Sequence, residues 1–387
     1  MRSMDFRPTP AQAALRHEVR TFLAADPALR ARAVPEDGWI TGFDPAFSRR
    51  LGARGWIGLT WPRAYGGSER SYLDRLIVTE ELLLAGAPVA AHWFGDRQIG
   101  PSLLAHGTAE QKEKFLPPTA RGERVYCIGM SEPGAGSDLA ALATRAELDG
   151  DEFVIRGQKT WTSFATQADY CYLVARTDPS AARHRGISEL LVPMDVPGIE
   201  VRPIRDMVGE EHFGELFFDD VRVPRSALIG ALHGGFRQIM QQLDYERSGI
   251  ERLLSNWPLW RDALAFAREH GRLRDAALAQ EVAELETARR CGRLLVYRVA
   301  SLLSQGTLPN HEAALAKAYC TRVEQRMADL AARILGPTAL LRAGSPGAAL
   351  GGRAARALLY APAYTIQGGT DNILRNIIAR RGLGLAE

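Results

Sequence analysis

The chain has 387 residues, a length that suits two or three packed domains better than a single core. Hydrophobic residues make up 46% and charged residues 24%, which argues against disordered, collagen-like and supercharged proteins. The formal net charge of +3 is too even to predict, by itself, a nucleic-acid partner or an anionic membrane surface.

Four further features of the sequence bear on the compartment and on metal binding. The first 19 residues carry charges and a proline where a signal peptide needs an apolar core, and no charge-free apolar run reaches the roughly 18 residues of a membrane span. The four cysteines lie far apart in the sequence without a CxxC pair, and the eight histidines form neither HxxxH nor HExxH. We expect a cytoplasmic protein without a disulfide framework, a metal site or a membrane span.

Helical patterns dominate the first third of the chain. Thr9 suits a helix cap, Pro10 suits the first helical position, and apolar residues then recur at the spacing of one helix face. A loop rich in turn formers over 60–71 interrupts the helices, and an apolar segment over 72–89 resumes them. We expect residues 1–122 to form a helical N-terminal domain.

Short alternating runs bounded by Gly, Pro and Asp replace the helical pattern near Glu123. They predict an antiparallel β domain over 123–232, with strands at 152–156, 170–176, 189–193, 199–203 and 215–223. From Gly235 onward helical stretches return, broken at glycines and prolines, so residues 233–387 are predicted to form a helical bundle. The expected fold class is α+β, with helices, sheet and helices in that order.

Three segments contain residues suited to ligand binding, although each is weak evidence alone. The glycines of SEPGAGSD (131–138) let a backbone approach a flat or phosphorylated ligand, but Leu139 stands where a dinucleotide fingerprint needs its third glycine. In GQKTWTS (157–163) a tryptophan offers a ring face between hydroxyl groups; the alternative is a core tryptophan at a strand end. QGGTDN (367–372) opens a helix whose free amides suit an anion, or simply caps the last helix.

Together these segments resemble the acyl-CoA dehydrogenase family. The blocks MSEPGAGSDL, GQKTWTS and GGTDNILRNIIARR, preceded by GWIGLTWPRAYGG at 55–67, match that family in order and spacing over nearly the whole chain. The resemblance implies a flavoprotein that holds FAD between the middle β domain and the C-terminal bundle, with the adenosine end reaching a neighbouring subunit.

The resemblance also implies roles for individual residues. The implied cofactor contacts are Met130, Ser131, Gly136, Trp161, Ser163, Thr370 and Asn372. Met130 and Ser131 would meet the flavin ring, and Trp161 would shield it. The implied substrate contacts are Ser137, Tyr245 and Arg247, although a structural ion pair is equally open for Arg247. Arg202 and Arg205 could meet a CoA phosphate, but a solvated strand end is the favoured interpretation.

The prediction of the catalytic base starts from a position where many family members carry a glutamate and this chain does not. The reaction needs a base for the α-proton of a thioester while the β-hydrogen leaves as hydride to the flavin. Many family members carry this glutamate just before the last Gly-Thr, where this chain has Gly368. A smaller set, including actinobacterial members, carries it on the first bundle helix, where Glu246 stands. We predict Glu246 as the base; the alternative is a surface glutamate paired with a basic neighbour.

Two altered segments bear on assembly and function. Residues 267–274 lack a Phe-Gly pair, and residues 333–337 lack a Gly-Gly pair, that usually accompany FAD binding in homotetramers. These changes resemble actinobacterial members built from unlike subunits, so a homo- or hetero-oligomer (a dimer of dimers) stays open. The predicted function is α,β-dehydrogenation of an acyl thioester on CoA or acyl-carrier protein, with an electron-transfer flavoprotein as acceptor. A flavin-dependent monooxygenase and a non-catalytic partner subunit are the alternatives.

Overall fold

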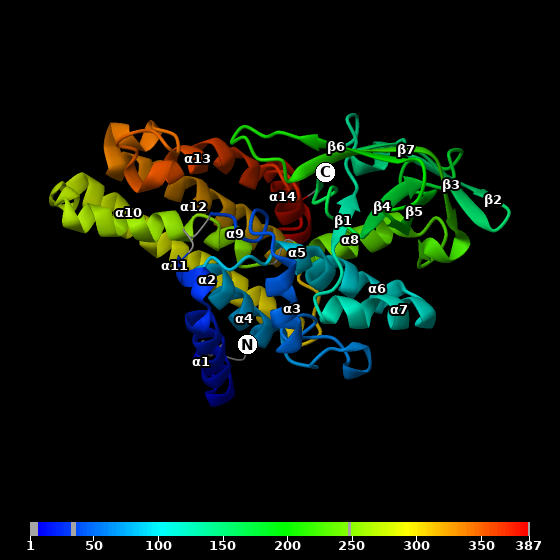
Figure 1. Cartoon of the computed structure of the whole chain (residues 1–387), viewed down its shortest axis with the longest axis horizontal. Helices are drawn as coiled ribbons and strands as arrows, with labels where there is room; N and C mark the ends of the chain where they lie inside the picture. The colour runs from blue at the N-terminus through cyan, green and yellow to red at the C-terminus, as the bar shows by residue number, and fades with distance from the viewer. Residues whose placement is uncertain (1–6, 32–35, 247–248, 386–387) are drawn as a thin grey trace.

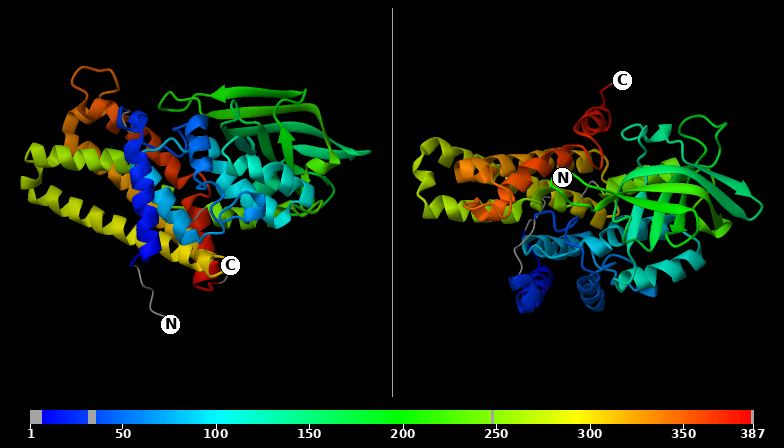
Figure 2. Two further views of the ribbon diagram at one scale, coloured as in Figure 1. Left: turned by 60° about the horizontal axis from the view of Figure 1, so that its bottom comes forward. Right: turned by 45° about the horizontal axis from the view of Figure 1, so that its top comes forward.

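The computed structural model describes residues 7–31, 36–246 and 249–385. A β-sheet lies at one end of the molecule, the long C-terminal helices lie at the other, and the N-terminal helices pack against both (Figure 1). The two further views in Figure 2 show the same separation of sheet and long helices. The predicted order of helices, sheet and helices is confirmed.

The N-terminal helices begin where the sequence predicts a cap. Thr9 accepts a hydrogen bond from the Gln12 amide ahead of a proline at the first helical position, and Ser71 caps α4 in the same way. The helices are α1 (Pro10–Ala25), α2 (Pro27–Ala31), α3 (Pro45–Ala53), α4 (Tyr72–Leu84), α5 (Ala90–Phe94), α6 (Gly100–His106) and α7 (Ala109–Ala120).

The middle of the chain forms an eight-stranded sheet in the order β6-β7-β3-β2-β4-β5-β8, with β1 paired to β4. Its strands are β1 (Tyr126–Gly129), β2 (Arg145–Asp149), β3 (Glu152–Ser163), β4 (Tyr170–Arg176), β5 (Ile187–Pro193), β6 (Ile199–Ile204), β7 (Phe213–Pro224) and β8 (Leu228–Ile229). The sheet is mostly antiparallel, but β1 and β2 pair with β4 in parallel. The predicted antiparallel β domain is confirmed as a mostly antiparallel sheet. The parallel pairs arise because the chain reaches β4 from β1 and β2 through loops and β3 rather than through a hairpin.

Helices cover the sheet and fix its position. Leu103 of α6 and Leu116 of α7 pack with Tyr172 and Leu191 in one buried cluster, and Ile239 packs with Val174 in another. The C-terminal helices are α8 (Gly235–Glu246), α9 (Glu251–Leu254), α10 (Trp257–Glu269), α11 (Ala276–Ser304), α12 (His311–Leu335), α13 (Arg353–Tyr360) and α14 (Asp371–Ile377). Among the described helices, none combines the length and the apolarity needed to cross a membrane.

A buried group of charges joins the N-terminal helices to the bundle. Glu80 of α4 accepts hydrogen bonds from Arg16 of α1 (2.8 Å) and from Arg293 and Tyr297 of α11 (2.9 and 3.0 Å). Its neighbour Glu81 accepts hydrogen bonds from Arg16 and from Arg20. We call the six residues Arg16, Arg20, Glu80, Glu81, Arg293 and Tyr297 the arginine network. It links α1, α4 and α11 side chain to side chain.

Candidate active site

The loop that follows β1 leaves open space above its glycines. Met130 and Ser131 are half-buried at the start of the loop, and Gly134, Gly136 and Ser137 are exposed. A β-carbon added to Gly134 or Gly136 would meet no described atom within 4 Å. The backbone there is therefore accessible to a ligand from outside the sheet.

Trp161 stands next to this loop in a strained conformation. Its φ is +56°, in the left-handed region that costs a non-glycine residue about 1–2 kcal/mol, and it lies at a β-bulge between Lys159 and Thr162. The indole is 57% exposed and meets the ring of Phe213 edge-on, with centroids 5.6 Å apart. The alternative of a core tryptophan was therefore wrong. Strain that is held beside an open loop is typical of a ligand site.

Hydrogen bonds bring the loop and the bulge together. The Thr160 amide donates to the Ser131 carbonyl over 2.9 Å. Ser163 pairs across the sheet with Phe213, the residue whose ring contacts Trp161. Four of the predicted cofactor contacts therefore lie together near the carboxyl end of β3: Met130, Ser131, Trp161 and Ser163.

A buried ion pair between Lys159 and Glu132 holds the loop that follows β1. The Lys159 ammonium, fully buried, donates to Glu132 Oε1 over 2.7 Å and to the Met130 carbonyl over 3.1 Å. Burial lowers the pKa of Lys159, and Glu132 opposes that change. Burial alone would raise the pKa of Glu132, but Lys159 and the amides of Ala143 and Thr144 hold it below its usual value. Each group therefore opposes the effect of burial on its partner's pKa.

Lys159 was not among the predicted site residues, although its position in the strand pattern indicates a buried charge. Lys159 shares the strand parity of Phe153 and Ile155, whose side chains are buried. A charged residue at a core-facing position of a strand indicates a buried partner. Glu132, in the glycine-rich motif itself, is that partner.

The remaining predicted cofactor residues lie on the bundle rather than the sheet. Thr370 caps α14 by accepting a hydrogen bond from the Ile373 amide (3.4 Å), and Asn372 is exposed in the first turn. The helix packs on α12. Gly368 and Gly369 precede it with φ values of +64° and +100°. The predicted cofactor contacts thus fall into two groups, one on each domain.

Glu246 is the last residue of α8. Gln238, two turns earlier in this helix, donates to Glu189 of β5 and to the Ile229 carbonyl, which fixes α8 against the sheet. The side chains of Asp244, Tyr245 and Glu246, and the whole of Arg247, lie outside the part of the chain that the structure describes. Their roles therefore stay predictions.

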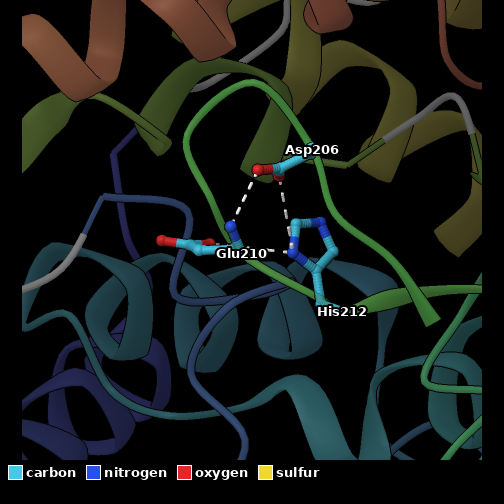
Figure 3. A group of neighbouring side chains, drawn as sticks. All are labelled: Asp206, Glu210 and His212. Carbon is cyan, nitrogen blue, oxygen red and sulfur yellow. Dashed lines mark hydrogen bonds and ion pairs between the residues drawn. The ribbon is translucent and has the colours of Figure 1, made fainter.

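A group of polar side chains in the β6–β7 loop escaped the sequence analysis. The side chains of Asp206, Glu210 and His212 lie together (Figure 3). His212 Nδ1 lies 3.6 Å from Glu210 Oε2 and 3.9 Å from Asp206 Oδ2. The spacing of these donor atoms suits a metal, but Glu210 already receives two hydrogen bonds from Arg356 of α13, at 2.8 and 2.9 Å. A guanidinium thus supplies the positive charge here, and the group ties the loop to the bundle.

The β6–β7 loop reaches the candidate site through one aromatic contact. The His212 ring lies 4.1 Å from the ring of Phe213, which in turn packs against Trp161. Burial lowers the pKa of His212, so the imidazole is neutral at pH 7. The ion pair between Arg356 and Glu210 therefore helps to hold the β6–β7 loop, and through it the Phe213 ring that Trp161 packs against.

The residues fit a flat, ring-shaped cofactor such as a flavin. The exposed indole of Trp161 offers a ring face, and the open space above Gly134 and Gly136 lets a ligand approach the backbone. Ser131, whose carbonyl accepts from the Thr160 amide, and Ser163, two residues after Trp161, supply hydroxyl groups in the same region.

Comparisons with known proteins agree with this architecture. Family models for the N-terminal, middle and C-terminal domains of acyl-CoA dehydrogenase match residues 9–123, 127–221 and 233–383. Acyl-CoA dehydrogenase IpdE1 of Mycobacterium tuberculosis is 38% identical over 88% of this chain and 87% of its own length.

Two solved structures of complexes are similar to the chain. The "Tcur3481-Tcur3483 steroid ACAD" is 35% identical with a TM-score of 0.90, and covers 99% of this chain and 100% of the matched one. The ChsE4-ChsE5 complex of Mycobacterium tuberculosis is 36% identical with a TM-score of 0.87, at the same coverage of both chains. The chain therefore belongs to the acyl-CoA dehydrogenase family, flavoprotein oxidoreductases that act on CH–CH groups of acyl thioesters.

Proposed function

We propose that the chain catalyses FAD-dependent α,β-dehydrogenation of an acyl thioester, with Glu246 as the base that takes the α-proton. The observation that carries this proposal is the strained, exposed Trp161 beside the Met130–Ser131 loop, which forms one wall for a flat cofactor. When bound, FAD supplies the acceptor for the β-hydride at flavin N5. The loop and Trp161 orient the ring, and Glu246 accepts the proton.

The backbone conformation at Gly368 supports the proposal that the catalytic base stands at another position of the chain. Its φ of +64° lies in the left-handed region, where a glutamate would be strained by about 1–2 kcal/mol. Glycine at this position also leaves room for a bulky acyl group. Glu246 is the last residue of α8, and Gln238 of the same helix donates to Glu189 of the sheet.

The base is tested with Glu246→Gln. This variant keeps the side-chain volume and removes the basic group, so we expect bound FAD to be retained and substrate-dependent flavin bleaching to slow by roughly a hundredfold or more. Asp244→Asn is the matched control, because two residues of helix place it about 200° around the axis from Glu246. Bleaching at the native rate in Glu246→Gln would refute the assignment.

The substrate we propose is a CoA thioester with a bulky acyl group, such as a steroid side chain. The similarity to the "steroid ACAD", together with a glycine at 368 where many family members carry a glutamate, supports a bulky chain. A panel of short, branched and steroid-derived thioesters, each on CoA and on acyl-carrier protein, tests this through the rate of flavin bleaching. A clear preference for short linear chains, or for the carrier protein, would contradict it. We propose an electron-transfer flavoprotein as the acceptor.

We further propose that the active form contains a second, unlike family member. Both solved complexes described above pair two different named chains. In the altered segment 267–274, Arg272 donates to the Ile334 carbonyl at the end of α12 and is thus engaged within its own subunit. Purified alone, the chain should contain well under one FAD per subunit and gain FAD on co-expression with a partner. A stable homotetramer with one FAD per subunit would refute this.

A further inference from the structure

Lysine is scarce in this chain, and its placement is selective. Of 48 basic residues only four are lysines: Lys112, Lys114, Lys159 and Lys317. The first two lie on the outer side of α7, whereas Lys159 and Lys317 are both 0% exposed. A sequence that places arginine at nearly every other cationic position has therefore retained lysine at two fully buried ones.

Both buried lysines hold main-chain carbonyls. Lys317 donates to the carbonyls of Gly369 (2.9 Å) and Tyr364 (3.4 Å), in the turn before α14. Lys159 donates to the Met130 carbonyl in the loop after β1. A compact ammonium can reach acceptors that converge from different directions, whereas a planar guanidinium needs room for its fork. Space at Lys159 is limited, since its side chain is fully buried.

We propose that Lys159 is a positioning residue that fixes the direction of the Ser131 amide toward the flavin. This inference rests on the proposed function and assigns a new role within it. Lys159 holds the Met130 carbonyl, and the Thr160 amide holds the Ser131 carbonyl, so two successive carbonyls point toward β3. In a trans peptide the next N–H points the opposite way, so the Ser131 N–H is directed away from Lys159.

Glu132 completes this device by holding Lys159 in place. Its carboxylate accepts from the Lys159 ammonium at Oε1 and from the amides of Thr144 (2.9 Å) and Ala143 (2.6 Å). The loop is thereby fixed at three consecutive residues, 130, 131 and 132, by groups of β3 and of the segment before β2. Removal of the ammonium frees the Met130 carbonyl, and the Ser131 amide is then no longer held in one direction.

The test compares Lys159→Met with Lys159→Met/Glu132→Gln. The single variant leaves a buried carboxylate without its cation and is prone to misfold; the double variant removes both charges and keeps the side-chain volumes. In the double variant we expect roughly tenfold weaker FAD binding, an altered visible flavin spectrum, and faster hydrogen exchange at residues 130–132 of the FAD-free protein. Lys159→Arg should not have native FAD affinity or the native flavin spectrum either, because the planar guanidinium does not fit in place of the ammonium.

The control is Glu189→Gln, which neutralises another buried carboxylate of the same sheet without contact to the 130–132 loop. It should leave the flavin spectrum and FAD affinity unchanged. Native FAD affinity, spectrum and exchange in the double variant would overturn the proposal. A native protein that binds no FAD even with its partner would instead refute the proposed function, and exchange at 130–132 would still test the role of Lys159.

Discussion

The molecule holds two buried charge networks that are built on opposite plans. In the sheet, a fully buried lysine meets one carboxylate and a backbone carbonyl within a single domain. Between the helices, the arginine network joins α1, α4 and α11, and its guanidinium side chains stay partly in water, at 18% exposed for Arg16, 38% for Arg293 and 60% for Arg20.

This difference separates two uses of buried charge. The arginine network connects side chains, and an arginine that loses its partner can turn toward solvent at modest cost. Lys159 orders a main-chain segment and has no route to water, so loss of its partner leaves an uncompensated charge in a dry environment. Of these two networks, the one with lysine holds a loop and the one with arginines joins helices.

The largest effect should come from Glu132→Ala. It leaves the Lys159 ammonium buried without a carboxylate, so we expect the free energy of unfolding to fall by about 3–5 kcal/mol. Denaturant unfolding of the native protein and the variant measures this loss. The double variant Lys159→Met/Glu132→Gln should recover most of it, and a loss below about 1 kcal/mol for Glu132→Ala would show that Lys159 finds other acceptors or water.

The next effect concerns a buried carboxylate that has no lysine. Burial raises the pKa of Glu189 from 4.5 to about 7, although Tyr172 and the hydrogen bond from Gln238 oppose the rise. A raised folded-state pKa means that stability is full below about pH 4.5 and falls as the pH rises toward 7, by roughly 3 kcal/mol at most. Glu189→Gln should remove this loss, so its stability relative to the native protein should increase from pH 4.5 to pH 8. A difference that is independent of pH would contradict this.

Local sequence signals predicted much of the fold. The cap at Thr9 and the breaks at glycines between the C-terminal helices, as at Gly271 and Gly306, depend on residues next to one another, and the structure has them. The strands β1 and β2 were missed for different reasons. β1 (Tyr126–Gly129) is a four-residue run without alternation, and β2 (Arg145–Asp149) alternates but contains Ala, Glu and Asp, which are depleted in strands. β3 was predicted to end at residue 156 but runs to Ser163, because a bulge interrupts its alternation.

Residues of the candidate site could be predicted from the sequence only where they belong to a family motif. The family blocks pointed to Met130, Ser131 and Trp161, but strand alternation could not show that a bulge at Trp161 turns the indole outward. The contacts of Glu210 with Arg356 and of Glu189 with Gln238 join residues far apart in sequence, and nothing local to either partner indicates them. Glu246 stays a prediction that rests on the family pattern.

A smaller effect is expected from Glu80→Gln in the arginine network. Burial alone would raise the pKa of Glu80, but Arg293 and Arg16 lower it below its usual value. The variant keeps the volume and removes the charge, and both arginines can hydrate, so we expect a loss of about 2 kcal/mol. Denaturant unfolding beside Glu132→Ala compares the two networks directly. An equal or larger loss for Glu80→Gln would reverse the comparison.

The smallest effect should come from Arg202→Gln at the solvated edge of β6. Arg202 forms a two-bond fork on Glu200, at 2.7 and 3.1 Å, and lies over the Phe217 ring, but its side chain is 58% exposed. Because water competes for both charges, good geometry without burial should contribute little, and the melting temperature should stay within the scatter of replicate measurements. The same variant decides between the two interpretations of this arginine. An unchanged KM for a CoA thioester supports a solvated strand end, whereas a raised KM at unchanged melting temperature would place Arg202 at the CoA phosphates.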